Sequence, residues 1–169
     1  MSTEFPAALA EVARVDFPYD SEDDIDFEPY QEFRPDEDTA YWLPLWTGTN
    51  LLNPKDFLVF GQDGTGGYAI IWLADADAPI TEQPVVFLGS EGDRGVIASD
   101  LADFLWLLAD GSGPLEAVDD PERPSRPNPA LTAIAERHAP AARKSAAEVI
   151  SLARSRFPRF EEMIAEACG

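Results

Sequence analysis

The fold is decided by the stretch FLVFGQDGTGGYAIIWL, residues 57–73. Two runs rich in aliphatic and aromatic residues, 57–60 and 68–73, flank a segment with four glycines at positions 61–67. Such runs are typical of β-strands, and glycine accepts the positive φ angles that a tight turn between strands requires. The stretch therefore predicts a β-hairpin.

Two further apolar runs, 85–88 and 95–98, extend the pattern after the hairpin. The loops between the four runs are too short for crossover helices, so we expect an antiparallel meander. Residues 100–110 predict a helix that begins at Asp100, a good N-cap, and ends at Gly111. Apolar residues recur along it at helical spacing: Leu101, Phe104, Leu105 and Leu108. The fold class is α+β, a mostly antiparallel sheet of about four or more strands flanked by helices.

The segment before the hairpin is less regular. Residues 5–14 predict a short helix, and residues 20–28 are too charged for a core. The interleaved Ile25, Phe27 and Tyr30 could still anchor this acidic segment to the domain. For residues 41–46 we expect a turn or a short helix, because Pro44 interrupts the apolar run.

A proline-rich stretch divides the chain after residue 120. Four prolines in residues 121–129 exclude a helix interior or a central strand, so these residues predict an extended linker. Three helical patterns follow it. We therefore divide the chain into an α+β domain with an acidic N-terminal segment (1–120), a linker (121–129) and a helical C-terminal extension (130–169).

The formal net charge is −20 and the sequence pI is about 4.1. Residues 1–40 carry −11, residues 41–120 carry −11, and residues 121–169 carry +2. This balance argues against binding to nucleic acid or to an anionic membrane, whose phosphates repel the chain. No apolar run approaches the ~18 residues of a membrane span, and the N-terminus lacks the pattern of a signal peptide. We expect a cytoplasmic protein.

Three patterns suggest chemistry, but each lacks a required residue or context. Residues 61–67 have neither phosphate-loop spacing nor a following helix. If a calcium-binding loop began at Asp20, Ile25 would stand at the position that requires glycine. Gln31 would stand at the last position, which requires a glutamate that binds calcium through both oxygens. A catalytic pair of Cys168 and His138 would lack rigid support, because Cys168 is the penultimate residue. We expect a non-enzymatic protein without cofactor, metal or catalytic residue.

Part of the chain resembles a known family. Residues 60–67 (FGQDGTGG), 84–92 (PVVFLGSEG) and 96–108 (VIASDLADFLWLL), with Tyr68 and Trp72 between the first two, are similar to the SUKH superfamily. This group comprises bacterial immunity proteins and a yeast cell-wall-assembly regulator. The similarity covers about residues 53–118. It implies an α+β fold and a non-enzymatic binding role, in bacteria most often the neutralisation of a polymorphic toxin.

The charge agrees with that implication, because the basic cleft of a nuclease toxin would attract an acidic surface. The expected partner is a protein, a basic toxin domain whose active site is occluded. A regulatory adaptor of the same fold without a toxin partner is the alternative. Two interpretations of the acidic segment also stay open: it is a binding patch for a partner, or it is only a solvated surface. The candidate partner-binding residues are Asp20, Glu22, Asp23, Asp24, Asp26, Glu28, Trp42, Trp46 and Asp63.

Overall fold

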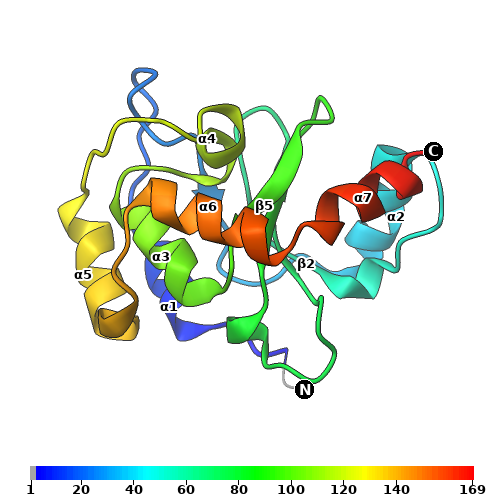
Figure 1. Cartoon of the computed structure of the whole chain (residues 1–169), viewed down its shortest axis with the longest axis horizontal. Coiled ribbons are helices and arrows are strands. Elements are labelled where there is room, and N and C mark those ends of the chain that lie inside the picture. The colour runs from blue at the N-terminus through cyan, green and yellow to red at the C-terminus, as the bar shows by residue number, and fades with distance from the viewer. Residues whose placement is uncertain (1–2) are drawn as a thin grey trace.

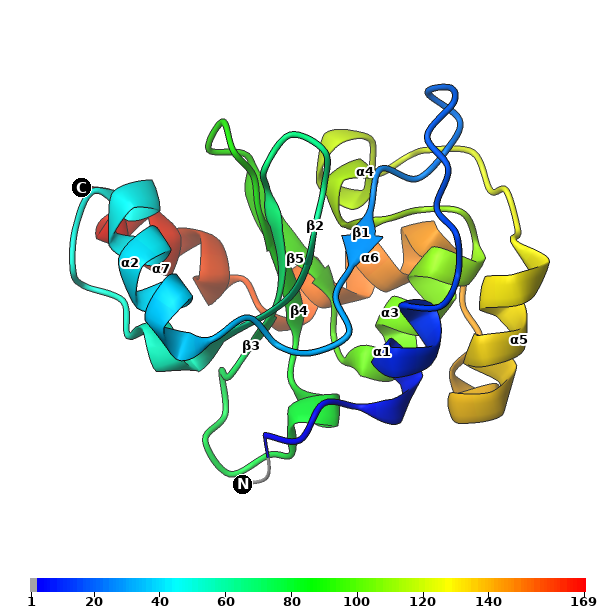
Figure 2. The same cartoon turned by 180° about the vertical axis from the view of Figure 1, so that it is seen from behind.

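The computed structural model describes residues 3–169 and contains a five-stranded antiparallel sheet with helices on both faces (Figures 1 and 2). The order of the strands in the sheet follows the chain, so the topology is a meander. The α+β prediction is confirmed, and β1 is a strand that the sequence patterns did not indicate. The strands are β1 (Glu28–Pro29), β2 (Phe57–Gln62), β3 (Tyr68–Trp72), β4 (Val85–Leu88) and β5 (Arg94–Ala98).

Helices precede, interrupt and follow the strands. None of those in residues 3–169 has the length and apolar character needed to cross a membrane. The α-helices are α1 (Ala7–Val12), α2 (Asp36–Thr47), α3 (Leu101–Ala109), α4 (Pro114–Asp119), α5 (Pro129–His138), α6 (Ala146–Arg156) and α7 (Arg159–Ala167). Short 3₁₀ helices are η1 (Pro54–Asp56), η2 (Ile80–Glu82) and η3 (Pro140–Ala142).

Both faces of the sheet are buried, because consecutive strand residues point to opposite faces and both sets are apolar. One face packs on α1 and α3 through Leu58, Phe60, Ile71, Val85, Phe87 and Ile97. The other face packs on α2 and α7 through Phe57, Val59, Ile70, Val86, Leu88 and Val96. The sheet is thus the middle layer of the molecule (Figure 2).

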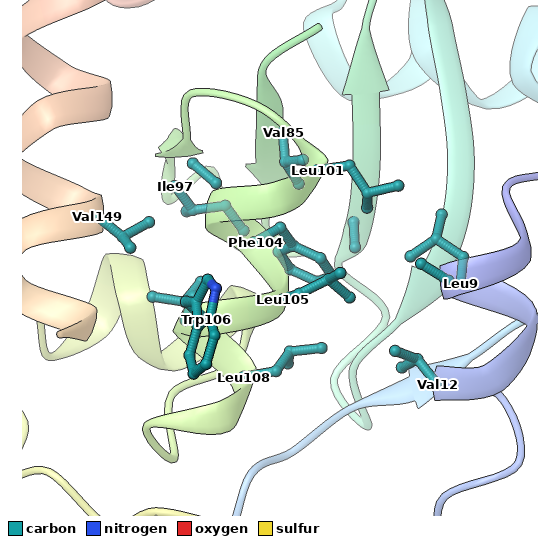
Figure 3. Packing of buried hydrophobic residues seen from close by; sticks show 14 of the residues in the cluster. Leu9, Val12, Val85, Ile97, Leu101, Phe104, Leu105, Trp106, Leu108 and Val149 are labelled. Atoms are coloured by element: carbon teal, nitrogen blue, oxygen red, sulfur yellow. The ribbon is translucent and has the colours of Figure 1, made fainter. Parts of the chain in front are cut away.

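Helix α3 lies at the centre of the larger cluster (Figure 3). Its predicted face of Leu101, Phe104, Leu105 and Leu108 is buried, but Trp106 and Leu107 on the other side are buried as well. The Trp106 Nε1–H donates to the Ala139 carbonyl at 2.8 Å. The helix is therefore enclosed on all sides rather than packed through one face.

The C-terminal segment supplies much of that enclosure. Helix α5 packs on α3 and α1, and α6 packs on α3 and β5. Val149 of α6 belongs to the first cluster and Ala153 to the second, so this helix passes from one face of the sheet to the other beside edge strand β5. Phe160 and Ile164 of α7 are fully buried in the second cluster. Residues 130–169 therefore contribute to both clusters.

Helix α2 is longer than the turn or short helix that we expected at residues 41–46. It has 12 residues and continues through Pro44. The first turn carries Asp36, Glu37 and Asp38, which interact favourably with the positive end of the helix dipole. Leu43 is buried against the sheet, with Trp42 and Trp46 packed beside it. Burial of this face outweighs the one backbone hydrogen bond that Pro44 cannot donate.

A pair of matched substitutions tests this packing. Leu108 is fully buried, whereas Leu45 is 68% exposed. We expect Leu108→Ala to lower the free energy of unfolding by about 2–5 kcal/mol, because it leaves a cavity among packed side chains. Leu45→Ala should change it by less than about 0.5 kcal/mol. Urea denaturation followed by tryptophan fluorescence measures both values, and equally small losses would contradict the burial of α3.

Candidate partner-binding surface

The acidic segment, residues 20–28, is fixed to the domain by two of the predicted anchors. Ile25 and Phe27 are buried, with exposed fractions of 9% and 3%. The Phe27 ring lies 5.4 Å from Phe17 and 6.3 Å from Phe104 in edge-on contacts. It also lies so close to Gly61 that a Cβ there would be 2.5 Å from the ring, so Gly61 permits this contact. The acidic side chains between and around the anchors lie at the surface.

Hydrogen bonds hold several of these carboxylates in place. Asp24 Oδ2 accepts from the backbone amides of Asp20 and Ser21 at 2.9 and 3.2 Å. Asp26 Oδ1 accepts from the Gly64 amide at 2.8 Å, which joins the acidic segment to the β2–β3 turn. Glu28 accepts from the Gln62 side chain at 2.9 Å. The segment is therefore a set of positioned charges.

Two arginines of the proline-rich linker complete the support. Arg123 donates from Nε to the Gly111 carbonyl at 2.9 Å, and from its two terminal nitrogens to the carbonyls of Glu22 and Asp23. Arg126 forms an ion pair with Asp23 at 3.0 Å. The sequence patterns did not indicate these contacts, because about 100 residues separate the partners. Arg123 fixes the backbone of the acidic turn and leaves the Glu22 carboxylate exposed.

A buried carboxyl group lies under the same segment. Glu116 of α4 is 7% exposed, and its Oε2 accepts from the Asp26 amide at 3.1 Å. Burial raises the pKa of the Glu116 carboxyl above its ordinary value, and the Asp26 amide and Arg123 oppose the shift only in part. Glu116 thus links α4 to the acidic segment at some electrostatic cost.

The fold brings other acidic segments to the same edge of the molecule. The β4–β5 turn contacts the β2–β3 turn through Ser90 and Thr65, whose hydroxyls are 3.3 Å apart. The β2–β3 turn contacts Asp26, and α4 contacts Asp26 through Glu116. Both views show these segments along one edge (Figures 1 and 2). We call this surface the acidic edge; its exposed or half-buried carboxylates are Asp20, Glu22, Asp23, Asp24, Asp26, Glu28, Glu91, Asp93, Asp119, Asp120 and Glu122.

Asp63 does not belong to this surface, contrary to its prediction as a contact residue. It is 2% exposed, and its Oδ1 accepts from the Thr65 and Gly67 amides at 2.7 and 3.1 Å. Gly66 in the same turn has φ of 95°, as expected of a hairpin glycine. Asp63 shapes the turn and has no surface to offer a partner.

Trp42 and Trp46 face the sheet. The Trp42 ring contacts Tyr68 edge-on at 4.5 Å, and the Trp46 Nε1–H donates to the Gly89 carbonyl at 2.6 Å. Both side chains are half-buried against the second cluster. The large apolar side chains of α2 that are exposed belong to Tyr41 and Leu45, which lie on the side of the helix opposite to the buried Leu43.

His138 and Cys168 are not brought together. Helix α5, which ends at His138, and helix α7, which precedes Cys168, lie at opposite ends of the molecule (Figure 1). His138 pairs instead with Glu11, which also accepts from Arg137. These hydrogen bonds, first from His138 and then from Arg137, lower the pKa of Glu11. Within residues 3–169, no three His, Cys, Asp or Glu side chains are grouped so as to hold a metal ion.

Comparisons with known proteins add no assignment. The chain matches no family model, and neither the curated proteins nor the solved structures give a significant match.

The raised pKa of Glu116 predicts the direction in which the stability of the protein changes with pH. Between the ordinary carboxyl value of 4.5 and the raised pKa, the folded state binds more protons than the unfolded state. Stability contributed by Glu116 is therefore present at low pH and is lost as the pH rises through the raised pKa. We expect Glu116→Gln, which keeps an acceptor but has no charge, to gain stability relative to the parent protein as the pH rises to about 7.

Urea denaturation at several pH values between about 4.5 and 7 measures this difference, with exposed Glu122→Gln as the matched control. The control should show a smaller dependence on pH, because its carboxylate remains in water in the folded state. A difference for Glu116→Gln that is constant with pH would contradict the assignment of a raised pKa.

Proposed function

We propose that this protein is a non-enzymatic binding protein, an immunity protein that neutralises a polymorphic toxin by occluding the toxin's basic active site. The observation that carries the proposal is the acidic edge, where carboxylates from three separate parts of the chain converge. Those of the acidic segment are held in place by buried anchors and hydrogen bonds. The resemblance of residues 53–118 to the SUKH superfamily supports the same role. The location that we propose for the protein is the cytoplasm.

Electrostatics supports a basic partner. Among the basic side chains near this edge, Arg123 and Arg126 are engaged with the acidic segment, and Arg94 pairs with Glu161 at 2.8 Å. A surplus of negative charge therefore faces solvent. A nuclease cleft is basic in order to hold phosphate, so such a surface would be drawn to it and would compete with the nucleic acid.

A regulatory adaptor that binds a basic protein without a toxin partner is the second candidate. The acidic edge favours it equally, because steering by charge does not depend on what the partner does. The genomic neighbourhood separates the two: a toxin gene directly upstream favours the immunity protein. Co-expression of that toxin with and without this protein then tests neutralisation directly, and undiminished toxicity would contradict it.

The acidic edge also predicts how the partner associates. Glu22, Glu91 and Asp120 are exposed, and their side chains have no ion pair or hydrogen bond among the described residues. We expect the triple variant Glu22→Gln, Glu91→Gln, Asp120→Asn to lower the association rate about three- to tenfold at low salt. The dissociation rate should change less, because exposed rim charges act mainly on the encounter of the two proteins.

The control variant removes the same net charge elsewhere, with Asp77→Asn, Glu82→Gln and Glu166→Gln. The partner captured from native cells is used to measure kinetics at two salt concentrations by surface plasmon resonance. Association should slow for the edge variant and hardly for the control, and high salt should remove the difference. Equal slowing by both variants would exclude the acidic edge as the steering surface.

A further inference from the structure

Helix α2 is apolar on the side that faces solvent as well as on the side that faces the sheet. Tyr41 is 75% exposed and Leu45 is 68% exposed, and they are one turn apart on the helix. A helix that is apolar all round is normally buried. The outward positions form one stripe at helical spacing, which we call the outer stripe: Glu37, Ala40, Tyr41, Pro44, Leu45 and Gly48.

Two polar features accompany the apolar side chains of this stripe. Pro44 has no N–H, so the Ala40 carbonyl lacks the amide that would normally bond to it four residues on. The first turn carries three carboxylates, of which Asp38 lies 3.7 Å from Arg34. Asp36 and Glu37 have no basic partner within residues 3–169. The stripe therefore offers apolar contact beside negative charge and a backbone acceptor.

This chemistry disfavours a second copy of the chain as the occupant. Two α2 helices packed parallel would bring their acidic first turns together. Packed antiparallel, each acidic turn would meet the negative carboxyl end of the other helix dipole. The net charge of −20 adds repulsion in both arrangements.

A helix with basic residues complements the charge of the same surface. Lysine or arginine in the last turn of a helix is favourable for that helix's own dipole. In an antiparallel arrangement on α2, this turn lies beside Asp36 and Glu37 while apolar side chains cover Tyr41 and Leu45.

We propose that the outer stripe of α2 binds a helix of the partner protein that has an apolar face and a basic last turn. This inference rests on the proposed function, because it takes from it that the partner is a basic protein. Trp46 donates to Gly89 at the start of the β4–β5 turn, so α2 contacts one of the turns that form the acidic edge. The acidic edge then steers the encounter, and Tyr41 and Leu45 supply the desolvated contacts that slow dissociation.

The test uses a synthetic peptide and the full chain, so it does not depend on identifying the partner. The peptide is amidated, has leucines at helical spacing between alanine and glutamine residues, and ends in three arginines. The control peptide ends in three glutamates instead. Two-dimensional ¹H–¹⁵N NMR follows which backbone amides shift during titration and gives the dissociation constant.

We expect the arginine peptide to shift α2 amides and to bind at least about tenfold more tightly than the glutamate peptide. The variant Tyr41→Ser, Leu45→Ser should weaken binding by at least about tenfold, whereas Tyr19→Ser, at another exposed aromatic residue, should not. Both sites are exposed, so the variants retain the fold, which their NMR spectra verify.

Three results would overturn the inference. The first is equal binding of the two peptides, and the second is binding that survives Tyr41→Ser, Leu45→Ser. In either case the proposed function keeps its own kinetic test at the acidic edge. The third is concentration-dependent shifts of α2 amides without peptide that Leu45→Ser abolishes, because these would assign the stripe to a second copy of the chain.

Discussion

The burial of α3 on nearly every side is the constraint on which the rest of the structure depends. A helix that buries Trp106 as well as Phe104 and Leu108 cannot be covered by one face of a sheet, because Trp106 points away from the other two. Its remaining sides need further helices, and α5 and α6 supply them. The proline-rich linker carries the chain back over α3, where the amides of Arg126 and Asn128 donate to the carbonyls of Asp110 and Ala109. Burial of α3 therefore determines where the linker and its arginines lie.

The position of the acidic edge follows from the topology and from this linker. In an antiparallel meander the β2–β3 and β4–β5 turns lie at the same end of the sheet, so their acidic residues converge. The acidic segment reaches that end because Phe27 packs over Gly61, and Arg123 secures its turn from the linker. Carboxylates from distant parts of the chain thereby become one surface.

Local patterns were sufficient for β2 to β5 and for α3, because hairpin glycines and helical spacing act over a few residues. Ile25, Phe27 and Tyr30 among the acids indicated only that the segment could be anchored; in the structure Ile25 and Phe27 are buried and Tyr30 packs half-buried against the second cluster. Local patterns gave wrong predictions where contacts between distant parts of the chain, or within a turn, determine the structure. Pro44 indicated a break, but packing on the sheet keeps α2 intact. Asp63 looked like an exposed turn acid, yet it bonds the amides of its own turn. No local signal could place Arg123 on residues that lie about 100 positions earlier.

A cluster of like charges costs free energy in the folded state, and this fold keeps the cluster rigid at that cost. The backbone around Glu22 and Asp23 is bonded to Arg123, and Glu116 is buried beneath Asp26 despite the desolvation of its carboxyl. A loose acidic tail would avoid much of the repulsion by spreading in solvent. A partner would then have to order that tail on binding, with a loss of conformational entropy. Fixing the carboxylates beforehand moves this loss to the folding step, which favours rapid and specific association over maximal stability of the free protein.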